Sequence, residues 1–354
     1  RIWESVHAAV IRSINAGSAT KRGLFYFFLS VGEIHTYLYD MFTGLLPQFS
    51  KRNRFIDMFV SIIPLIVLTP FKKLGDVLVF SKLQNKLGGR FKAGISGGGA
   101  LPSHVDKFFR TVGISVLEGY GLTETAPVLA VRVDSRPVPN TVGPLLEDIE
   151  YRVISKDGAI MPVGYKGELH VKSEQIMQGY YKEPELTAAV LKNGWLNTGD
   201  IAVFTHTGEF KILGRSKETI VLRGGENVEP VPIEDKLCES IYVSQVMVVG
   251  QDQKFLGALI VPNVEELEKY SIEKGVSYLE KEELVSNPFI EELMNMEIQS
   301  LVNAKNGFKA FERIFRFRLL AKEFEVGVEM TQSLKLRRNV IEKIYKQEIK
   351  DIFK

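Results

Sequence analysis

The sequence contains a single cysteine, no strong excess of either charge and no apolar leader at its amino terminus. Cys238 cannot form an internal disulfide, which fits a reducing compartment and a small buried apolar side chain at that position. The net charge of +2 gives no reason to expect nucleic acid as a partner. The first residue is Arg rather than Met, so we expect the chain to begin inside a longer protein.

The chain also lacks an apolar run that reaches the ~20 residues needed to cross a bilayer as a helix. The apolar run at 24–32 follows Lys21-Arg22, as in a signal peptide, but it is internal and too short. The run at 60–71 is also too short, and it contains Pro64 and Pro70. We expect both runs to form core helices, and a role at a membrane surface is the alternative.

The length of 354 residues predicts about two domains, and 45% hydrophobic with 25% charged residues is an ordinary globular composition. Apolar residues at helical spacing from Ile2 to Ile14, followed by Gly17, predict a first helix with a glycine cap. Helical, aromatic-rich sequence continues to about Leu87. His7 and His35 have no partner at ligand or triad spacing, so we expect both to be structural.

Two glycine loops follow. Residues 90–96 read as a buried strand, 101–113 as a helix and 114–121 as a second strand. This order implies parallel pairing, with a ligand crevice at the carboxyl ends of the strands. Gly97 to Gly99 and Gly119 to Gly121 would both lie there, and glycine lets a flat ligand approach the backbone closely. The alternative is that both loops are plain tight turns.

The residues GLTET, at 121–125, place two hydroxyls and one carboxylate just past the second strand. Thr123 is a candidate for contact with a phosphate. Glu124 is a candidate for holding a hydrated magnesium ion. Taken alone, the segment is equally a helix start, with Thr123 as the N-cap and Glu124 in the first turn.

From Thr141 the pattern becomes that of β-structure. Residues 148–154 and 167–173 alternate, and 201–213 predicts a hairpin with its turn at Thr207-Gly208. We expect a small antiparallel subdomain, of barrel-like form, that closes the first domain. The stretch 194–230 is then the seam between two domains. Beyond it we expect a helix opened by Pro230 and Pro232, a two-stranded unit at 243–263, charged helices, a strand at 312–320 and a terminal helix at 338–354.

Five ordered motifs resemble those of adenylate-forming enzymes, the superfamily of acyl-CoA synthetases, luciferases and peptide-synthetase adenylation domains. They are EGYGLTET, GELHVKS with GYYKEPELT, GWLNTGD, GRSKETIVLRGGENVEP and MTQSLKLRRNVI. Within that superfamily, the sequence most resembles the long-chain fatty-acid–CoA ligases. The segments that carry this resemblance are SGGGALP, IVLRGGENVEP, GFKAFERI and LKLRRNVI. The resemblance covers essentially the whole chain, and five motifs in order are far more specific than any one of them.

The resemblance implies a fold of α/β plus α+β type. Residues 1–213 would be the carboxy-terminal portion of a large AMP-binding domain, a parallel sheet with helices and a β-rich, barrel-like subdomain at about 141–213. Residues 214–354 would be a small mobile α+β domain with its hinge at 215–218. Two departures stand out. The family's phosphate loop with its lysine would lie upstream of Arg1, and Gln332 stands where the family usually has Pro.

The resemblance also implies a two-step reaction. A long-chain fatty acid reacts with ATP to give acyl-adenylate and pyrophosphate, and coenzyme A then displaces AMP. The implied cofactors and partners are ATP, Mg²⁺, coenzyme A and a fatty acid, with the missing amino-terminal half supplied in cis or in trans. We expect a cytoplasmic location, with peripheral contact on the cytoplasmic face of a membrane as an option for a long-chain acyl substrate.

Residue roles are carried over from the matching motifs. Asp200 is expected at the ribose, Arg215 at the ribose or a phosphate, and Gly98, Gly99, Tyr120 and Gly121 around adenine. Thr123 and Glu124 are the phosphate and magnesium candidates. Lys335 is expected to bridge the acyl carboxylate and the α-phosphate, and Lys217 to sit at the hinge. Gly224 and Gly225 are expected along the pantetheine path.

Two other readings stay open. The first keeps adenylate formation but changes the acceptor to acyl carrier protein, or changes the acid. The second is a non-catalytic remnant, or one half of a split enzyme. Acyl chain length is not fixed by these motifs.

Overall fold

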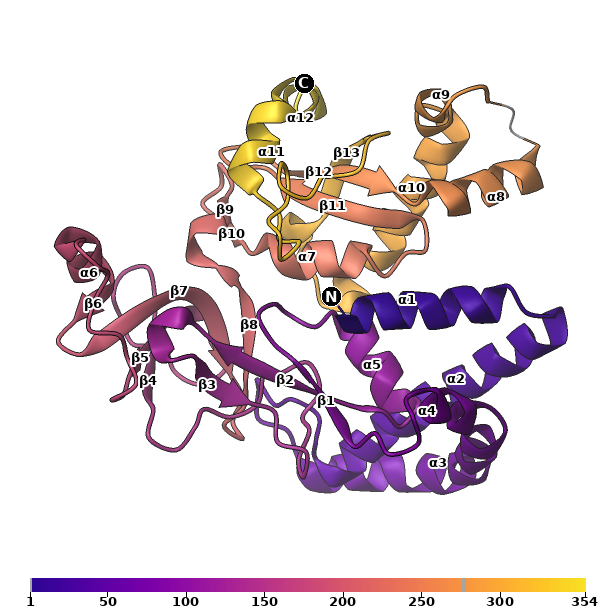
Figure 1. Ribbon diagram of the computed structural model, residues 1–354, viewed down its shortest axis with the longest axis horizontal. Helices are drawn as coiled ribbons and strands as arrows, with labels where there is room; N and C mark the ends of the chain where they lie inside the picture. Colours follow the sequence, from indigo (N-terminus) through magenta and orange to yellow (C-terminus); the bar gives the residue numbers. More distant parts are fainter. Residues whose placement is uncertain (1, 276–277) are drawn as a thin grey trace. The chain divides into compact units, whose positions relative to one another are not determined.

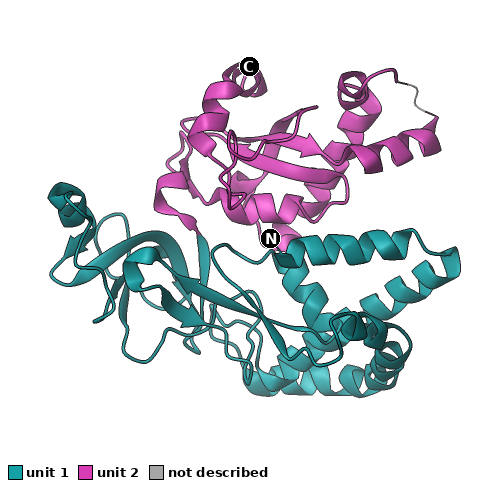
Figure 2. Ribbon diagram, in the orientation of Figure 1, with its two compact units in different colours: residues 1–213 teal, residues 214–354 magenta. Residues whose placement is uncertain are grey.

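The computed structural model describes residues 2–275 and 278–354. The chain divides into two compact units, Arg1–Leu213 and Gly214–Lys354 (Figure 2). Each unit has its own apolar core, and each is described separately below.

Unit 1 begins with helices (Figure 1). They are α1 Ile2–Asn15, α2 Ala19–Thr43, α3 Arg54–Gly75, a π-helical turn at Asp76–Phe80, and α4 Ser81–Lys86. Local sequence explains their limits. The Ser18 side chain accepts a hydrogen bond from the Lys21 N–H, and α2 ends at Gly44, whose φ of 73° is left-handed. The Asn53 side chain accepts from the Phe55 N–H and starts α3. The predicted first helix is confirmed.

The predicted strand–loop–helix–strand unit is also confirmed, but the prediction that its first strand is buried is wrong, because alternate residues of that strand are exposed, with Ile95 76% exposed. Strand β1 Ala93–Ser96 pairs in parallel with β2 Ser115–Gly121, with Ser96 opposite Glu118, and α5 Ser103–Thr111 connects them. The antiparallel β3 Val128–Val131 completes this sheet. α5 buries Val105, Phe108 and Phe109 against the first helices. Gly97 to Gly99 therefore follow the end of β1, and Gly119 to Gly121 are the last residues of β2, where they pair with β3, so both glycine segments lie at the same edge of the sheet.

A second sheet in unit 1 carries the GWLNTGD segment. Its strands are β4 Glu150–Ile154, β5 Gly167–Lys172, β6 Leu191–Lys192, β7 Trp195–Phe204 and β8 Phe210–Arg215, with α6 Pro184–Val190 before β6. The order is β4-β5-β7-β6, and β8 pairs with β7. Among the described residues this sheet is open rather than a closed barrel. Alternate residues of β5, including Leu169 and Val171, are fully buried, which is the pattern of a sheet covered on one face.

Unit 2 is built around a three-stranded sheet in the order β11-β12-β13. Antiparallel β11 Val243–Val249 and β12 Leu256–Pro262 form the predicted two-stranded unit, and β13 Ile314–Leu319 joins β12 in parallel. Helices α7 Pro230–Leu237, α8 Val264–Lys274, α9 Lys281–Val285, α10 Pro288–Leu301, α11 Arg338–Ile344 and α12 Lys346–Ile352 surround it. The expected single terminal helix is broken at Tyr345. Both faces of β12 are buried, with Ile260 in one core cluster and Leu259 in another.

Candidate functional site

Tyr120 and Asp200 lie together although they are far apart in sequence. Tyr120 stands near the end of β2, and Asp200 in the middle of β7. The Tyr120 hydroxyl donates a hydrogen bond of 2.6 Å to Oδ2 of Asp200, and the tyrosine ring packs edge-on against Phe210. The Asp200 side chain is 4% exposed, and its backbone N–H donates to Thr198 Oγ1 at 3.1 Å. The residues expected at adenine and at ribose are thus brought into contact.

Glu124 is held by the segment around Met177 and Tyr180, part of which is the GYYKEPELT motif. The turn Thr123–Thr125 is a short 3-10 helix. Its N-cap is Leu122, so the alternative of Thr123 as the cap is wrong. The Tyr180 hydroxyl donates to Glu124 Oε1 at 2.9 Å, and the Met177 N–H donates to the Glu124 carbonyl at 2.8 Å. Thr123 itself is exposed.

The glycines of the two loops differ in what they permit. Gly98 has a left-handed φ of 78°, and a Cβ built on Gly98 or Gly99 meets nothing within 4 Å. This first loop therefore presents open backbone. A Cβ on Gly121 would lie 1.9 Å from the Pro127 carbonyl oxygen, so glycine is required there for β2 to approach the turn. Gly121 has a packing explanation that is independent of any ligand.

A buried ionic network connects the two glycine segments, and the sequence patterns did not predict it. Arg132 is 1% exposed and bonds Glu118 Oε2 and Asp106 Oδ1, each at 2.7 Å. The other oxygen of Glu118 accepts from the Leu101 N–H at 3.0 Å, directly after the GGGA loop. Burial raises the pKa of Glu118 to about 7, against the opposing charge of Arg132. A charged residue inside one apolar strand, Glu118 in β2, and another directly after the apolar strand β3, Arg132, were the signal available in the sequence.

Unit 2 holds the predicted lysines on short turns. Lys335 lies in a loop closed by two hydrogen bonds with Thr331, one from each backbone N–H, of 2.9 and 3.0 Å. Leu334, just before it, has a left-handed φ of 61°. Within the described residues the exposed ammonium of Lys335 makes no hydrogen bond or ion pair. Lys217 lies in the 3-10 turn Ser216–Glu218, which directly follows Arg215.

Gly224 and Gly225 form the tip of a small hairpin between β9 Ile220–Val221 and β10 Asn227–Val228. Gly225 has a left-handed φ of 87°, and its N–H donates to the Leu222 carbonyl at 2.9 Å. A side chain at Gly225 would meet nothing within 4 Å, so the tip is open.

Arg338 links the turn Ser216–Glu218, where the hinge is predicted and which is here called the hinge turn, to α11 within unit 2. Its guanidinium contacts Glu218, next to Lys217, at 3.4 Å, and it also pairs with Glu234. Glu234 accepts a further bond of 2.7 Å from the Val248 N–H of the central sheet. The hinge turn, the start of α11 and strand β11 are therefore tied to one another.

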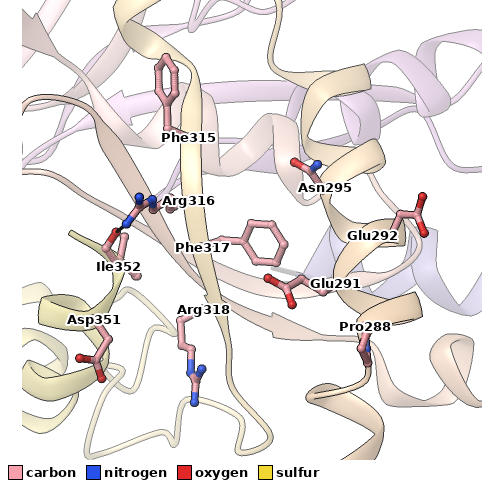
Figure 3. A pocket seen from close by; sticks show the side chains of 10 residues that line it. All are labelled: Pro288, Glu291, Glu292, Asn295, Phe315, Arg316, Phe317, Arg318, Asp351 and Ile352. Atoms are coloured by element: carbon pink, nitrogen blue, oxygen red, sulfur yellow. Dashed lines mark hydrogen bonds between the residues drawn. The ribbon is translucent and has the colours of Figure 1, made fainter. Parts of the chain in front are cut away.

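A groove of about 580 Å³ lies elsewhere on unit 2, among β13, α10 and α12 (Figure 3). Its lining is mixed, with Phe315, Arg318 and Glu291 among the side chains, and Arg316 donates to the Ile352 carbonyl at 3.5 Å. None of the lining residues is a predicted site residue.

The described residues could hold a magnesium ion through one carboxylate, but not through a site made of several protein ligands. In residues 2–275 and 278–354 no cluster of three or more His, Cys, Asp or Glu side chains could hold a metal ion. Mg²⁺ is usually held by one or two carboxylates together with substrate phosphates and water. Glu124, oriented by Tyr180, matches that donor set.

Two family models match the chain: the AMP-binding enzyme over residues 43–181, and the AMP-binding enzyme C-terminal domain over residues 217–354. The chain belongs to the AMP-binding, adenylate-forming enzymes. The predicted family and fold class are confirmed. An adenylate-forming ligase is accordingly the general activity that its relatives share.

Curated relatives from Arabidopsis thaliana include the probable acyl-activating enzyme 16, chloroplastic, which is 34% identical over 100% of this chain and 51% of its own length. The chloroplastic long-chain-fatty-acid–[acyl-carrier-protein] ligase AEE15 is 32% identical over 99% of this chain and 49% of its own. Long chain acyl-CoA synthetase 1 is 34% identical over 79% of this chain and 43% of its own. The chain spans about half the length of these relatives.

Solved structures show the same fold. The adenylation domain of a carboxylate reductase from Mycobacterium chelonae matches with a TM-score of 0.61 and 21% identity, over 92% of this chain and 45% of that one. The ATP-bound RpMatB-BxBclM chimera B1 matches with a TM-score of 0.59 and 24% identity, over 80% of this chain and 51% of that one.

Proposed function

We propose that the protein carrying this chain activates a long-chain fatty acid with ATP and transfers the acyl group to coenzyme A. The observation that carries the proposal is the contact of Tyr120 with Asp200. This contact places an aromatic ring and a carboxylate together, as a nucleoside site requires, and the backbone at Gly98 and Gly99 is open to a ligand. A carboxylate accepts from the vicinal ribose hydroxyls, and the ring stacks on adenine. Arg215 adds a planar donor for ribose or phosphate.

In the first step a carboxylate oxygen of the fatty acid attacks the α-phosphorus of ATP. The bond from that phosphorus to the bridging oxygen breaks, and pyrophosphate leaves. Two anions must meet, so cations have to offset their repulsion. The exposed ammonium of Lys335 supplies one such charge. Mg²⁺, when bound, neutralises phosphate charge, and Glu124 would hold it with Thr123 beside the phosphates.

In the second step the thiol sulfur attacks the acyl carbon. The bond between that carbon and the phosphate oxygen of AMP breaks, and AMP leaves. Lys335 and Asp200 belong to different compact units, so we propose that the units close on the nucleotide in step one. Rotation at 215–218 then brings Gly224 and Gly225 to the acyl-adenylate, where the open backbone at Gly225 admits a pantetheine arm.

Acyl carrier protein is the second candidate acceptor. A relative named as a long-chain-fatty-acid–[acyl-carrier-protein] ligase aligns with 99% of this chain, whereas a relative named as a long chain acyl-CoA synthetase aligns with 79%. Both acceptors present the same phosphopantetheine thiol, so the chemistry of step two is unchanged. We propose a cytoplasmic location for either reaction, which subcellular fractionation tests.

The complete gene product carrying this chain provides the test. Palmitate-dependent exchange of labelled pyrophosphate into ATP measures step one, and thioester formation with coenzyme A or with pantetheinylated acyl carrier protein measures step two. We expect exchange with palmitate and thioester with coenzyme A. Absence of exchange with any long-chain acid would overturn the proposed activation. Exchange followed by thioester formation on acyl carrier protein alone would replace the acceptor.

A further inference from the structure

Helix α3 has its polarity inverted relative to a helix of a water-soluble core. Its buried residues are Asp57, Ser61 and Gly75, and Thr69 shares a 3.2 Å hydrogen bond with His35 of α2. Its outward side chains are apolar: Phe59 is 78% exposed and Ile63 is 70% exposed. A surface helix in water directs its apolar face to the core and its polar face outward. The expectation that residues 60–71 form a core helix is wrong within the part of the chain that the structure describes.

The exposed apolar side chains form one continuous surface, here called the hairpin surface. It comprises Phe55, Ile56, Phe59, Val60, Ile63, Ile66, Val67, Phe71 and Leu74 of α3, with Val77 and Leu78 after it. The members recur at three- and four-residue spacing along a helix of 22 residues, so the surface is about 30 Å long. α3 packs on α2, and α2 packs on α5. Exposed apolar surfaces of this extent mark an interaction site.

The charges around the hairpin surface select its occupant. The acidic residue of α3, Asp57, is buried and paired with Arg52. Exposed Lys51 and Arg54 stand at the start of α3, and exposed Lys73 stands near its end. An apolar surface with cations at both ends is complementary to acyl chains bordered by anionic headgroups. A second copy of the same basic surface would be repelled.

The polar side of α3 determines whether the helix crosses a bilayer or lies at its surface. The helical stretch Arg54–Lys86 is long and apolar enough to cross a membrane by length and composition. However, Thr69 on the opposite side of α3 shares a hydrogen bond with His35 of α2, and α3 packs along α2, so this side of α3 is held within unit 1. We therefore propose that α3 lies in the plane of an anionic lipid bilayer and inserts the hairpin surface into it. This inference names the surface for peripheral membrane contact and does not depend on the proposed reaction.

The test is flotation of the purified 354-residue chain and of the complete gene product with lipid vesicles. The vesicles contain phosphatidylcholine alone or phosphatidylcholine mixed with phosphatidylglycerol. We expect both proteins to float with the mixed vesicles, and more weakly with the neutral ones. The double variant Phe59→Glu/Ile63→Glu should bind at least roughly tenfold more weakly, because two large apolar side chains can no longer insert. Both sites are exposed, and thermal unfolding checks that the variant folds.

The matched control is Ile160→Glu, which places the same charge on an apolar side chain of unit 1 that is 69% exposed but lies outside the hairpin surface. It should float like the unchanged protein. Lys51→Gln/Lys73→Gln should remove the preference for phosphatidylglycerol. Equal losses in the control and the double variant would overturn the proposal, as would flotation unaffected by Phe59→Glu/Ile63→Glu. If the chain floats but the complete gene product does not, an upstream segment of the protein covers the hairpin surface, and the proposal is overturned. If neither protein floats and the double variant breaks a dimer, a second copy covers the surface, and the proposal is likewise overturned.

Discussion

The Tyr120 hydroxyl donates a 2.6 Å hydrogen bond to Asp200, and this joins two different sheets of unit 1. The bond orients the carboxylate before any nucleotide arrives, so less side-chain freedom remains to be lost on binding. The strand pairing of β2 and the burial of β7 set the positions of both residues. Nucleotide affinity should therefore depend on both residues, and to different degrees.

Asp200→Ala should weaken AMP binding by about 1.5–3 kcal/mol, because a charged acceptor for ribose is lost. Tyr120→Phe keeps the ring and removes only the orienting hydroxyl, so its effect should be about 0.5–1.5 kcal/mol. Calorimetric titration of AMP into the complete gene product measures both. Asp157→Ala, at an exposed turn carboxylate of the same unit, is the control. Unchanged AMP affinity in Asp200→Ala would remove that residue from the site.

The Glu118 carboxyl should make stability depend on pH. Its pKa is raised to about 7 in the folded chain, mainly by burial, from an ordinary value of 4.5. The folded state therefore holds this proton more tightly than the unfolded state does, and the associated stability is lost as pH rises from 4.5 through 7. Glu118→Gln removes the ionisable group. The fall in the free energy of unfolding with rising pH should therefore be smaller in this variant by on the order of 1 kcal/mol or more.

Denaturant unfolding at pH 5 and pH 8, on both proteins, measures the change. The comparison needs the variant because His7 titrates in the opposite sense. Burial lowers the pKa of His7 to about 4, so its contribution is lost as pH falls below 6.5. The same pH dependence in Glu118→Gln and the unchanged protein would contradict the assignment.

Lys335 and Lys217 should separate the two half-reactions. Lys335→Ala removes the cation proposed for step one, so adenylate formation should be abolished while thioester formation from supplied acyl-adenylate is largely kept. Lys217→Pro fixes φ near −65° at the hinge turn and should impair thioester formation more than adenylate formation. Single-turnover assays of each step on the complete gene product measure both, with the exposed Lys305→Ala as the control. Equal loss of both steps in both variants would show that these lysines do not divide the reaction.

Arg338→Ala should destabilise unit 2 by about 3–5 kcal/mol, because Glu234 would stay buried without its cation. Urea unfolding followed by far-UV circular dichroism measures the loss. Lys343→Ala, an exposed basic residue of the same helix, should change stability by less than about 0.5 kcal/mol. A similar small effect of both substitutions would mean that water replaces the Arg338 ion pairs.

Sequence patterns were enough where local chemistry decides the structure. The β1–α5–β2 unit, the hairpin turning at Thr207-Gly208 and the helix opened by Pro230 were all predicted. The approach of Tyr120 to Asp200 was not, because spacing along the chain does not determine which strands of different sheets face each other. Arg132 was missed for the same reason: its partners Asp106 and Glu118 come from α5 and β2. The exposure of Phe59 and Ile63 was hidden because apolarity alone does not reveal what covers a helix.

Arg338 follows Lys335 by three residues and contacts Glu218, next to Lys217. The lysine loop and the turn Ser216–Glu218 are therefore held together within unit 2. The rotation proposed at 215–218 would then carry Lys335 along with unit 2, without a separate movement of its loop. Substitutions that slow this rotation, such as Lys217→Pro, should therefore also delay the departure of Lys335 from the acyl-adenylate.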